Sequence, residues 1–120
     1  MNRTRNVTRT TDLIKARGNR YRVEERWNQY SHTREDAFGI IDIIELDHKI
    51  GVIGIQVCGS DFVSHWNKLT INNAAATIDW LRTPGTKLFI YSWRKLKLKR
   101  GGKALRWAVK IREIKKEDIQ

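Results

Sequence analysis

The sequence predicts one α/β (α+β) domain over residues 1–120, with a mixed central β-sheet flanked by helices and the element order αβββαββ. Two segments repeat apolar residues at helical spacing, and five short segments alternate or run apolar as strands do. Three successive strands with short connections favour an antiparallel meander. A helix between the third and fourth strands allows a parallel crossover, so helices on the faces of one mixed sheet are expected.

The N-terminal segment is expected to form a helix and then a strand. Residues 8–16 form the helix, and Gly18 ends it as glycine commonly does. Residues 20–27 alternate regularly, which predicts the first strand. One face of this strand would carry Tyr21, Val23, Glu25 and Trp27.

Two apolar stretches supply the second and third strands. Residues 38–46, FGIIDIIEL, hold six apolar residues out of nine and predict a strand buried on both faces. In an extended chain Asp42 would share a face with Phe38 and Ile40. An ionised carboxylate in such a place costs several kcal/mol unless it is compensated. Residues 51–58, GVIGIQVC, form the third strand after a short turn.

The C-terminal half is expected to hold a long helix and two strands. The helix begins after a cap at Ser60 or Asp61 and runs to about Arg82. Strands over residues 86–93 and 104–114 follow, joined by the basic connection RKLKLKRGGK. The buried stripe of the helix would contain Phe62, Trp66, Leu69, Ala76 and Trp80, with Asn73 as its one polar interruption.

The charge of the chain predicts a polyanionic partner. Twenty-four Lys and Arg against 13 Asp and Glu give a net charge of +11. Residues 1–30 contribute +5, residues 31–60 contribute −3, residues 61–90 contribute +1 and residues 91–120 contribute +8, which sum to +11. A cationic balance of this size favours nucleic acid or, less often, an anionic membrane.

Cysteine usage and hydropathy favour a cytoplasmic protein. The single cysteine, Cys58, excludes an internal disulfide framework and a zinc site built from several cysteines. No run of 18 apolar residues is present, so no transmembrane helix is expected. The basic N-terminal segment also lacks the apolar centre of a secretory signal.

Three polar side chains interrupt apolar faces of consecutive predicted strands: Glu25, Asp42 and Gln56. Each one alone is explained by a buried hydrogen bond or a bend, but together they favour a site. Their oxygen atoms are ligands that Mg²⁺ and Mn²⁺ prefer, and a bound cation would stabilise a charged Asp42. Between two basic ends, such a site favours metal-assisted hydrolysis of phosphodiesters.

The run IDIIELDHKIGVIGIQV resembles the core of the PD-(D/E)XK nuclease superfamily, especially small archaeal- and phage-type Holliday junction resolvases. The resemblance covers residues 8–93 and implies a restriction-endonuclease-like αβββαβ core. Asp42 matches the aspartate of the second strand. The triplet Gln56-Val57-Cys58 falls where the family has acid-X-lysine, and Lys68 on the following helix is the candidate for a relocated lysine.

This resemblance implies a Mg²⁺-dependent (or Mn²⁺-dependent) DNA endonuclease of the kind that phages encode, which acts on branched DNA as a homodimer and leaves a 5′-phosphate. Asp42 would bind the metal, and Gln56, the Val57 carbonyl and Asp36 or Glu25 would complete its shell. Lys68 would stabilise the attacking hydroxide or the developing negative charge. Which of Glu24, Glu25 and Asp36 assists Asp42 stays open.

Two other functions remain open at this point. Gln56 and Cys58 also permit a nucleic-acid-binding protein on the same fold that has lost catalysis, and a nucleic-acid-binding protein without any metal site is a third possibility. The basic ends would hold phosphates without reading bases. The residues expected in this role are Arg3, Arg5, Arg9, Arg94, Lys95, Lys97, Lys99, Arg100 and Lys103.

Overall fold

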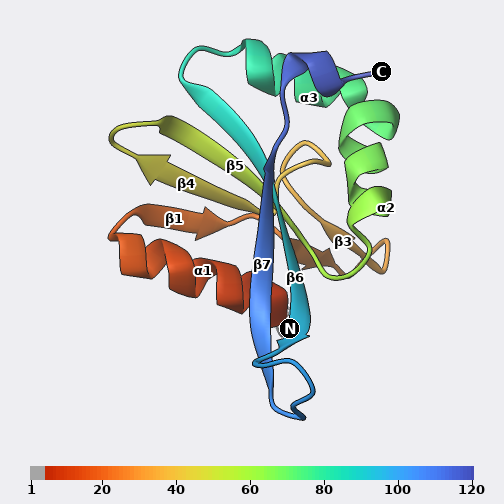
Figure 1. Cartoon of the computed structure of the whole chain (residues 1–120). Helices are drawn as coiled ribbons and strands as arrows, with labels where there is room; N and C mark the ends of the chain where they lie inside the picture. Colours follow the sequence, from red (N-terminus) through yellow and green to blue (C-terminus); the bar gives the residue numbers. More distant parts are fainter. Residues whose placement is uncertain (1–4) are drawn as a thin grey trace.

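The computed structural model of the chain describes residues 5–120, apart from the side chains of Trp27 and Arg34. Its centre is a five-stranded mixed sheet in which β5 and β6 run parallel and the other neighbours run antiparallel (Figure 1). In spatial order the strands are β1 (Arg20–Val23), β4 (Ile43–Asp47), β5 (Gly51–Cys58), β6 (Thr86–Lys97) and β7 (Leu105–Glu113). The predicted mixed sheet, with its meander and parallel crossover, is confirmed.

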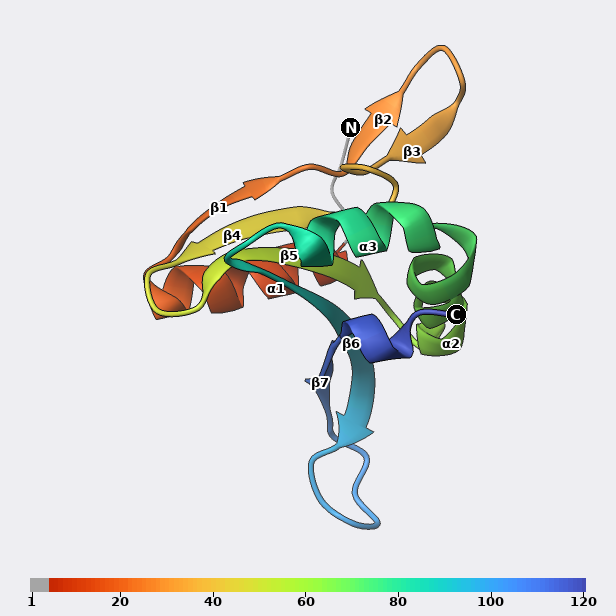
Figure 2. The ribbon, with the colours of Figure 1, turned by 90° about the horizontal axis from the view of Figure 1, so that it is seen from above.

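Helices cover both faces of this sheet, and each face has its own apolar core (Figure 2). On one face lies α1 (Arg5–Arg17), whose Val7 and Ile14 pack against the sheet. The other face is covered by α2 (Phe62–Asn67), the π-helical turn η1 (Lys68–Asn72) and α3 (Ala74–Arg82). Because both faces are covered, β5 is buried without alternation from Ile53 to Cys58.

The helix predicted from residue 60 or 61 to residue 82 is divided into three parts, because Asn73 leaves the helical path. Asn73 has φ −117° and ψ 33°, and its Nδ2 donates to the carbonyl of Gly39 at 2.8 Å. The side chain of Thr77 donates to the carbonyl of Leu69 at 2.7 Å. Asn73, the polar residue within the apolar stripe, thus finds a hydrogen-bond partner for its side-chain amide in another segment. The helical register changes at Asn73.

The strand predicted over residues 38–46 is wrong in its first half. Residues 38–40 form a turn in which Phe38 and Gly39 have φ values of 58° and 73°, and β4 begins only at Ile43. Phe38 is 72% exposed, whereas Ile40 and Ile41 are fully buried. Asp42 therefore lies just before β4, and the expectation that it shares a strand face with Phe38 is wrong.

The strand predicted over residues 20–27 is also divided. β1 ends at Val23, and the amides of Glu24 and Glu25 both donate to the carbonyl of Asp42, at 2.7 and 3.2 Å. The chain then forms a separate hairpin of β2 (Arg26–Asn28) and β3 (Thr33–Glu35), where an irregular loop was expected. At the N-terminus, α1 begins at Arg5 rather than at residue 8.

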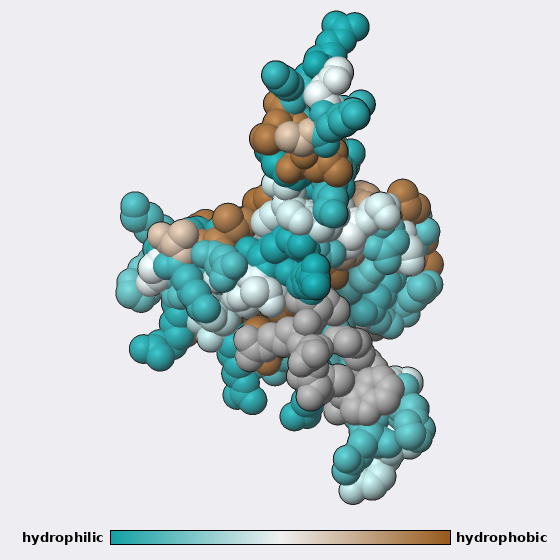
Figure 3. Space-filling view, turned by 90° about the horizontal axis from the view of Figure 1, so that it is seen from below, coloured by the Kyte–Doolittle hydropathy of each residue, from teal (hydrophilic) through white to brown (hydrophobic). Residues whose placement is uncertain are grey.

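Two hairpins project from the sheet (Figures 2 and 3). One is β2–β3, and the other, here named the basic arm, comprises residues 94–108 at the ends of β6 and β7. β6 extends four residues beyond its predicted end at residue 93. A short 3₁₀ turn, η2 (Lys116–Asp118), follows β7. Within residues 5–120, no helix has both the length and the apolar character needed to cross a membrane.

Candidate active site

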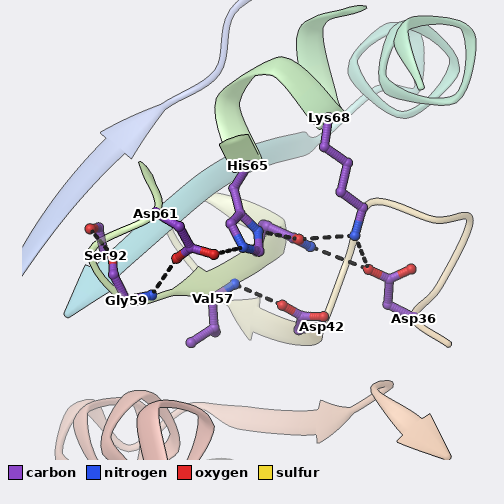
Figure 4. A network of polar contacts seen from close by, with 9 residues as sticks. Asp36, Asp42, Val57, Gly59, Asp61, His65, Lys68 and Ser92 are labelled. Carbon is purple, nitrogen blue, oxygen red and sulfur yellow. Dashed lines mark hydrogen bonds and ion pairs between the residues drawn. The ribbon is translucent and has the colours of Figure 1, made fainter. Parts of the chain in front are cut away.

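Four polar side chains from distant parts of the chain meet beside the end of β5 (Figure 4). Gln56 belongs to β5 and Lys68 begins η1, whereas Asp36 and Asp42 belong to the segment between β3 and β4. The site lies between the sheet and the helices α2 and η1. The fold thus brings together Asp36, Asp42, Gln56 and Lys68, which the sequence had nominated separately.

The amide of Gln56 has all of its hydrogen-bonding capacity used, which fixes its orientation. Nε2 donates to the carbonyl of Ile40 at 3.0 Å and to Oδ2 of Asp36 at 3.3 Å. Oε1 accepts a hydrogen bond from Nζ of Lys68 at 3.1 Å and lies 3.0 Å from Nδ1 of His65. Because a backbone carbonyl can only accept, the NH₂ group must face Ile40, and Nδ1 of His65 must be a donor.

Lys68 connects the helical layer to the segment before β4. Its Nζ lies 3.0 Å from Oδ2 of Asp36, and the two side chains are 34% and 11% exposed. The same Nζ donates to Gln56, so one cation contacts both a carboxylate and a neutral amide. The lysine that the resemblance expected on the helix therefore lies directly beside Gln56.

The carboxylate of Asp42 is buried, with 7% of the residue exposed. Its Oδ2 accepts a hydrogen bond from the amide of Val57 at 2.8 Å. Burial raises the pKa of Asp42 to about 7, the Val57 amide opposes this rise, and the charges of Glu25 and Asp36 raise the pKa further. Near neutral pH this group is poised between its acidic and ionised forms.

Of the three carboxylates expected as possible partners of Asp42, Glu24 makes different contacts from Glu25 and Asp36. Glu24 forms an ion pair with Arg22 at 3.2 Å. Glu25 and Asp36, in contrast, both raise the pKa of Asp42 through the repulsion of like charges. Val57 contributes its amide to Asp42, whereas the expected metal ligand was its carbonyl.

Asp61 and His65 form a further pair beside Gln56. Nε2 of His65 lies 3.0 Å from Oδ2 of Asp61, and Nδ1 of the same ring faces Gln56. Asp61 occupies the N-cap position of α2 but makes no side-chain cap bond there, contrary to the prediction for this residue. The i, i+4 spacing of the two residues places them on one face of the helix.

Cys58, Asp61 and His65 form a second group with metal-binding chemistry. Their ligand atoms all lie within 4.8 Å of one another. Thiolate, imidazole and carboxylate are the ligand types of zinc. Burial raises the pKa of Cys58 to about 11, so its thiol is neutral when no metal is bound. Cys58 is buried, with 5% of the residue exposed.

The carboxylates around Asp42 are of the ligand type that a hard divalent cation prefers. The charges of Glu25 and Asp36 raise the pKa of Asp42, and a cation bound beside Asp42 would favour its ionised form. Among the described residues, the amide of Val57 is the donor that contacts the Asp42 carboxylate. Oε1 of Gln56 already accepts hydrogen bonds from Lys68 and His65, so in this arrangement it does not serve as a metal ligand.

The two basic ends of the chain also meet. Cζ of Arg9 in α1 lies 3.5 Å from the ring centroid of Trp107 in the basic arm, and Nζ of Lys95 lies 5.2 Å from the same centroid. Arg5 begins α1, and Arg3 lies outside the described residues. The remaining expected phosphate-binding residues, Arg94, Lys97, Lys99, Arg100 and Lys103, are exposed on the arm.

Comparison of this chain with known protein families, with characterised proteins and with solved structures finds no match.

Proposed function

We propose that this protein is a metal-dependent, structure-specific DNA endonuclease with a restriction-endonuclease-like core. The observation that carries the proposal is the contact of Lys68 with both Asp36 and Gln56 next to the buried Asp42. A lysine beside carboxylates, at the end of a central strand, is the combination needed to bind a cation and to neutralise charge on a phosphate.

Asp42 and Asp36, assisted by Glu25, would hold Mg²⁺ or Mn²⁺. When bound, the ion would lower the pKa of a water molecule and polarise the phosphodiester. The chain itself provides the remaining functions. The Val57 amide orients Asp42, and the negative charges of Glu25 and Asp36 near Asp42 favour cation binding. Lys68 would stabilise the attacking hydroxide or the negative charge that develops on the phosphate.

Branched DNA, such as a Holliday junction, is the proposed substrate, and a homodimer in the cytoplasm is the proposed working form. The net charge of +11 and the contact of Arg9 with Trp107 in the basic arm support a DNA partner. The element order αβββαββ, with the β2–β3 hairpin inserted, supports the resemblance to small archaeal- and phage-type resolvases.

A catalytically inactive DNA-binding protein is the second candidate, and the orientation of Gln56 favours it. A neutral amide stands where an acidic metal ligand is expected, and its oxygen is already engaged by Lys68 and His65. On this alternative, Lys68 and Asp36 form a structural ion pair, and the basic surfaces carry the whole function.

The test is incubation of the purified protein with a labelled four-way junction, a linear duplex and a single strand, each with Mg²⁺, Mn²⁺ or EDTA. Cleavage that needs metal and is abolished in Asp42→Asn is the expected result. Asp79→Asn, an exposed aspartate in α3, is the matched control and should cleave normally. Cleavage that survives Asp42→Asn would remove the site assignment, and binding without cleavage would establish the second candidate.

A further inference from the structure

The basic arm continues from the same end of the sheet as the candidate active site. The last parallel pair between β5 and β6 is Cys58 with Ser92. Beyond it, β6 runs five more residues to Lys97 and pairs with β7 alone. At about 3.3 Å per residue, this two-stranded ribbon extends roughly 16 Å past the end of β5. The arm therefore begins at the end of the sheet where β5 reaches the candidate site, while its Trp107 face lies on the side of α1 and the candidate site lies on the side of α2 and η1.

The charge of the arm determines which kind of partner it accepts. Between residues 94 and 108 the chain carries seven Lys and Arg and no Asp or Glu. A second copy of this chain would bring the same charges against it, and like charges in contact cost several kcal/mol. The arm is therefore a surface for a polyanion and is a poor surface for self-association.

One face of the arm combines these cations with apolar side chains. The pairing of Lys95 with Trp107 and of Lys97 with Leu105 places all four on the same face, and Arg9 reaches this face from α1. Leu105 is 54% exposed and Trp107 remains 40% exposed despite the contact with Arg9. In Figure 3 the arm accordingly shows apolar side chains below a hydrophilic end.

An anionic membrane is the other polyanionic surface with an apolar interior, and the distribution of charge on the arm disfavours it. A hairpin that enters a membrane needs an apolar face free of cations. Here lysines alternate with the apolar side chains, and the end of the arm, KRGGK at residues 99–103, is itself cationic. Those charges would have to enter the membrane first.

We propose that the basic arm binds a nucleic acid strand with unpaired bases, such as a single strand or the open region of a branched DNA. Arg9 covers one face of the Trp107 ring, so Trp107 contacts bases through the exposed part of its ring, together with Leu105. Every base has a face that stacks on an aromatic ring. Arg9, Lys95 and Lys97 hold the phosphates on either side. This binding would take place on the α1 side of the sheet, and it does not require cleavage at the candidate site.

Binding measured by fluorescence anisotropy in EDTA tests this inference without involving catalysis. The ligands are a labelled single strand, a duplex of equal length, heparin as a competitor that lacks bases, and vesicles of anionic lipid. Trp107→Ala should weaken binding of the single strand about 10-fold, while binding of duplex and heparin changes less than about two-fold. Trp107→Phe keeps an aromatic ring and should stay close to the wild type. Tyr30→Ala, which removes another exposed aromatic residue, is the matched control.

Equal losses for single strand, duplex and heparin would overturn the inference, as would a loss in Tyr30→Ala as large as that in Trp107→Ala. Tight binding to anionic vesicles without a preference for the single strand would assign the arm to membranes instead. The two proposals fail separately. If cleavage needs metal but Trp107→Ala does not change the preference for single strand over duplex, only this inference is rejected. If that preference depends on Trp107 but no cleavage occurs, only the proposed nuclease function is rejected.

Discussion

Lys68 and Asp36 are 32 residues apart in the chain, yet Nζ of Lys68 donates to Oδ2 of Asp36 at 3.0 Å. This pair joins the helical layer to the segment that leads into β4. It also places a cation among carboxylates at the point where the buried Asp42 meets the end of β5.

Replacing Lys68 by Ala should abolish most catalysis while leaving metal binding intact. The cation opposite the developing charge is lost, and removal of one such group typically costs about 10²–10³-fold in rate. Single-turnover cleavage of the preferred DNA measures the effect. Lys49→Ala, an exposed lysine in the turn before β5, is the control and should cleave at the wild-type rate. A Lys68→Ala protein that keeps full activity would exclude a catalytic role for this residue.

The ionisation of Asp42 should make the protein less stable as the pH rises. Its pKa is about 7 in the folded state and 3.8 as the unperturbed value, so the folded state binds the proton more tightly. This contribution is fully present below about pH 4, and it is lost as the pH rises through 7. Asp42→Asn should therefore be more stable than the wild type by roughly 2–4 kcal/mol at pH 8 and nearly equal at pH 4. Urea unfolding at both pH values measures the difference, and a difference independent of pH would show that Asp42 ionises normally.

Added Mg²⁺ should stabilise the folded protein in a pH-dependent manner. A cation competes with the proton on Asp42, so binding should strengthen up to about ten-fold per pH unit below pH 7 and level off above it. Thermal unfolding with and without Mg²⁺ at pH 5.5 and pH 8 checks this prediction. The rise in Tm should be large only at pH 8, and it should vanish in Asp42→Asn. An equal rise at both pH values would place the ion elsewhere.

Gln56→Glu should destabilise the protein, although it restores the residue type expected from the nuclease family. The NH₂ group that donates to the Ile40 carbonyl would be replaced by an oxygen, and that buried carbonyl would lose its partner. The expected cost is about 1–3 kcal/mol, measured by urea unfolding in EDTA. Gln56→Met, which loses the same donor without adding a charge, separates the two effects. A Gln56→Glu protein as stable as the wild type would show that the Ile40 contact is dispensable.

The sequence identified the elements in which local pattern and burial agree. β5 was predicted with its observed bounds because an uninterrupted apolar run between turn residues leaves few alternatives. Asp42 and Gln56 were nominated as polar residues in apolar surroundings, and both are buried. Lys68 was nominated through the resemblance, and it lies beside them. For β5, Asp42 and Gln56 the signal is contained in residues that are neighbours along the chain.

The tertiary structure decided what depends on distant partners. Residues 38–40 form a turn within the apolar run, and the side chain of Asn73 donates a hydrogen bond to the carbonyl of Gly39 in this turn. The same contact divides the predicted helix. Arg9 reaches Trp107 only because α1 packs against the sheet beside the basic arm. Alternation and spacing report on nearest neighbours along the chain, whereas these features result from hydrogen bonds and packing between segments that meet only when the sheet has formed.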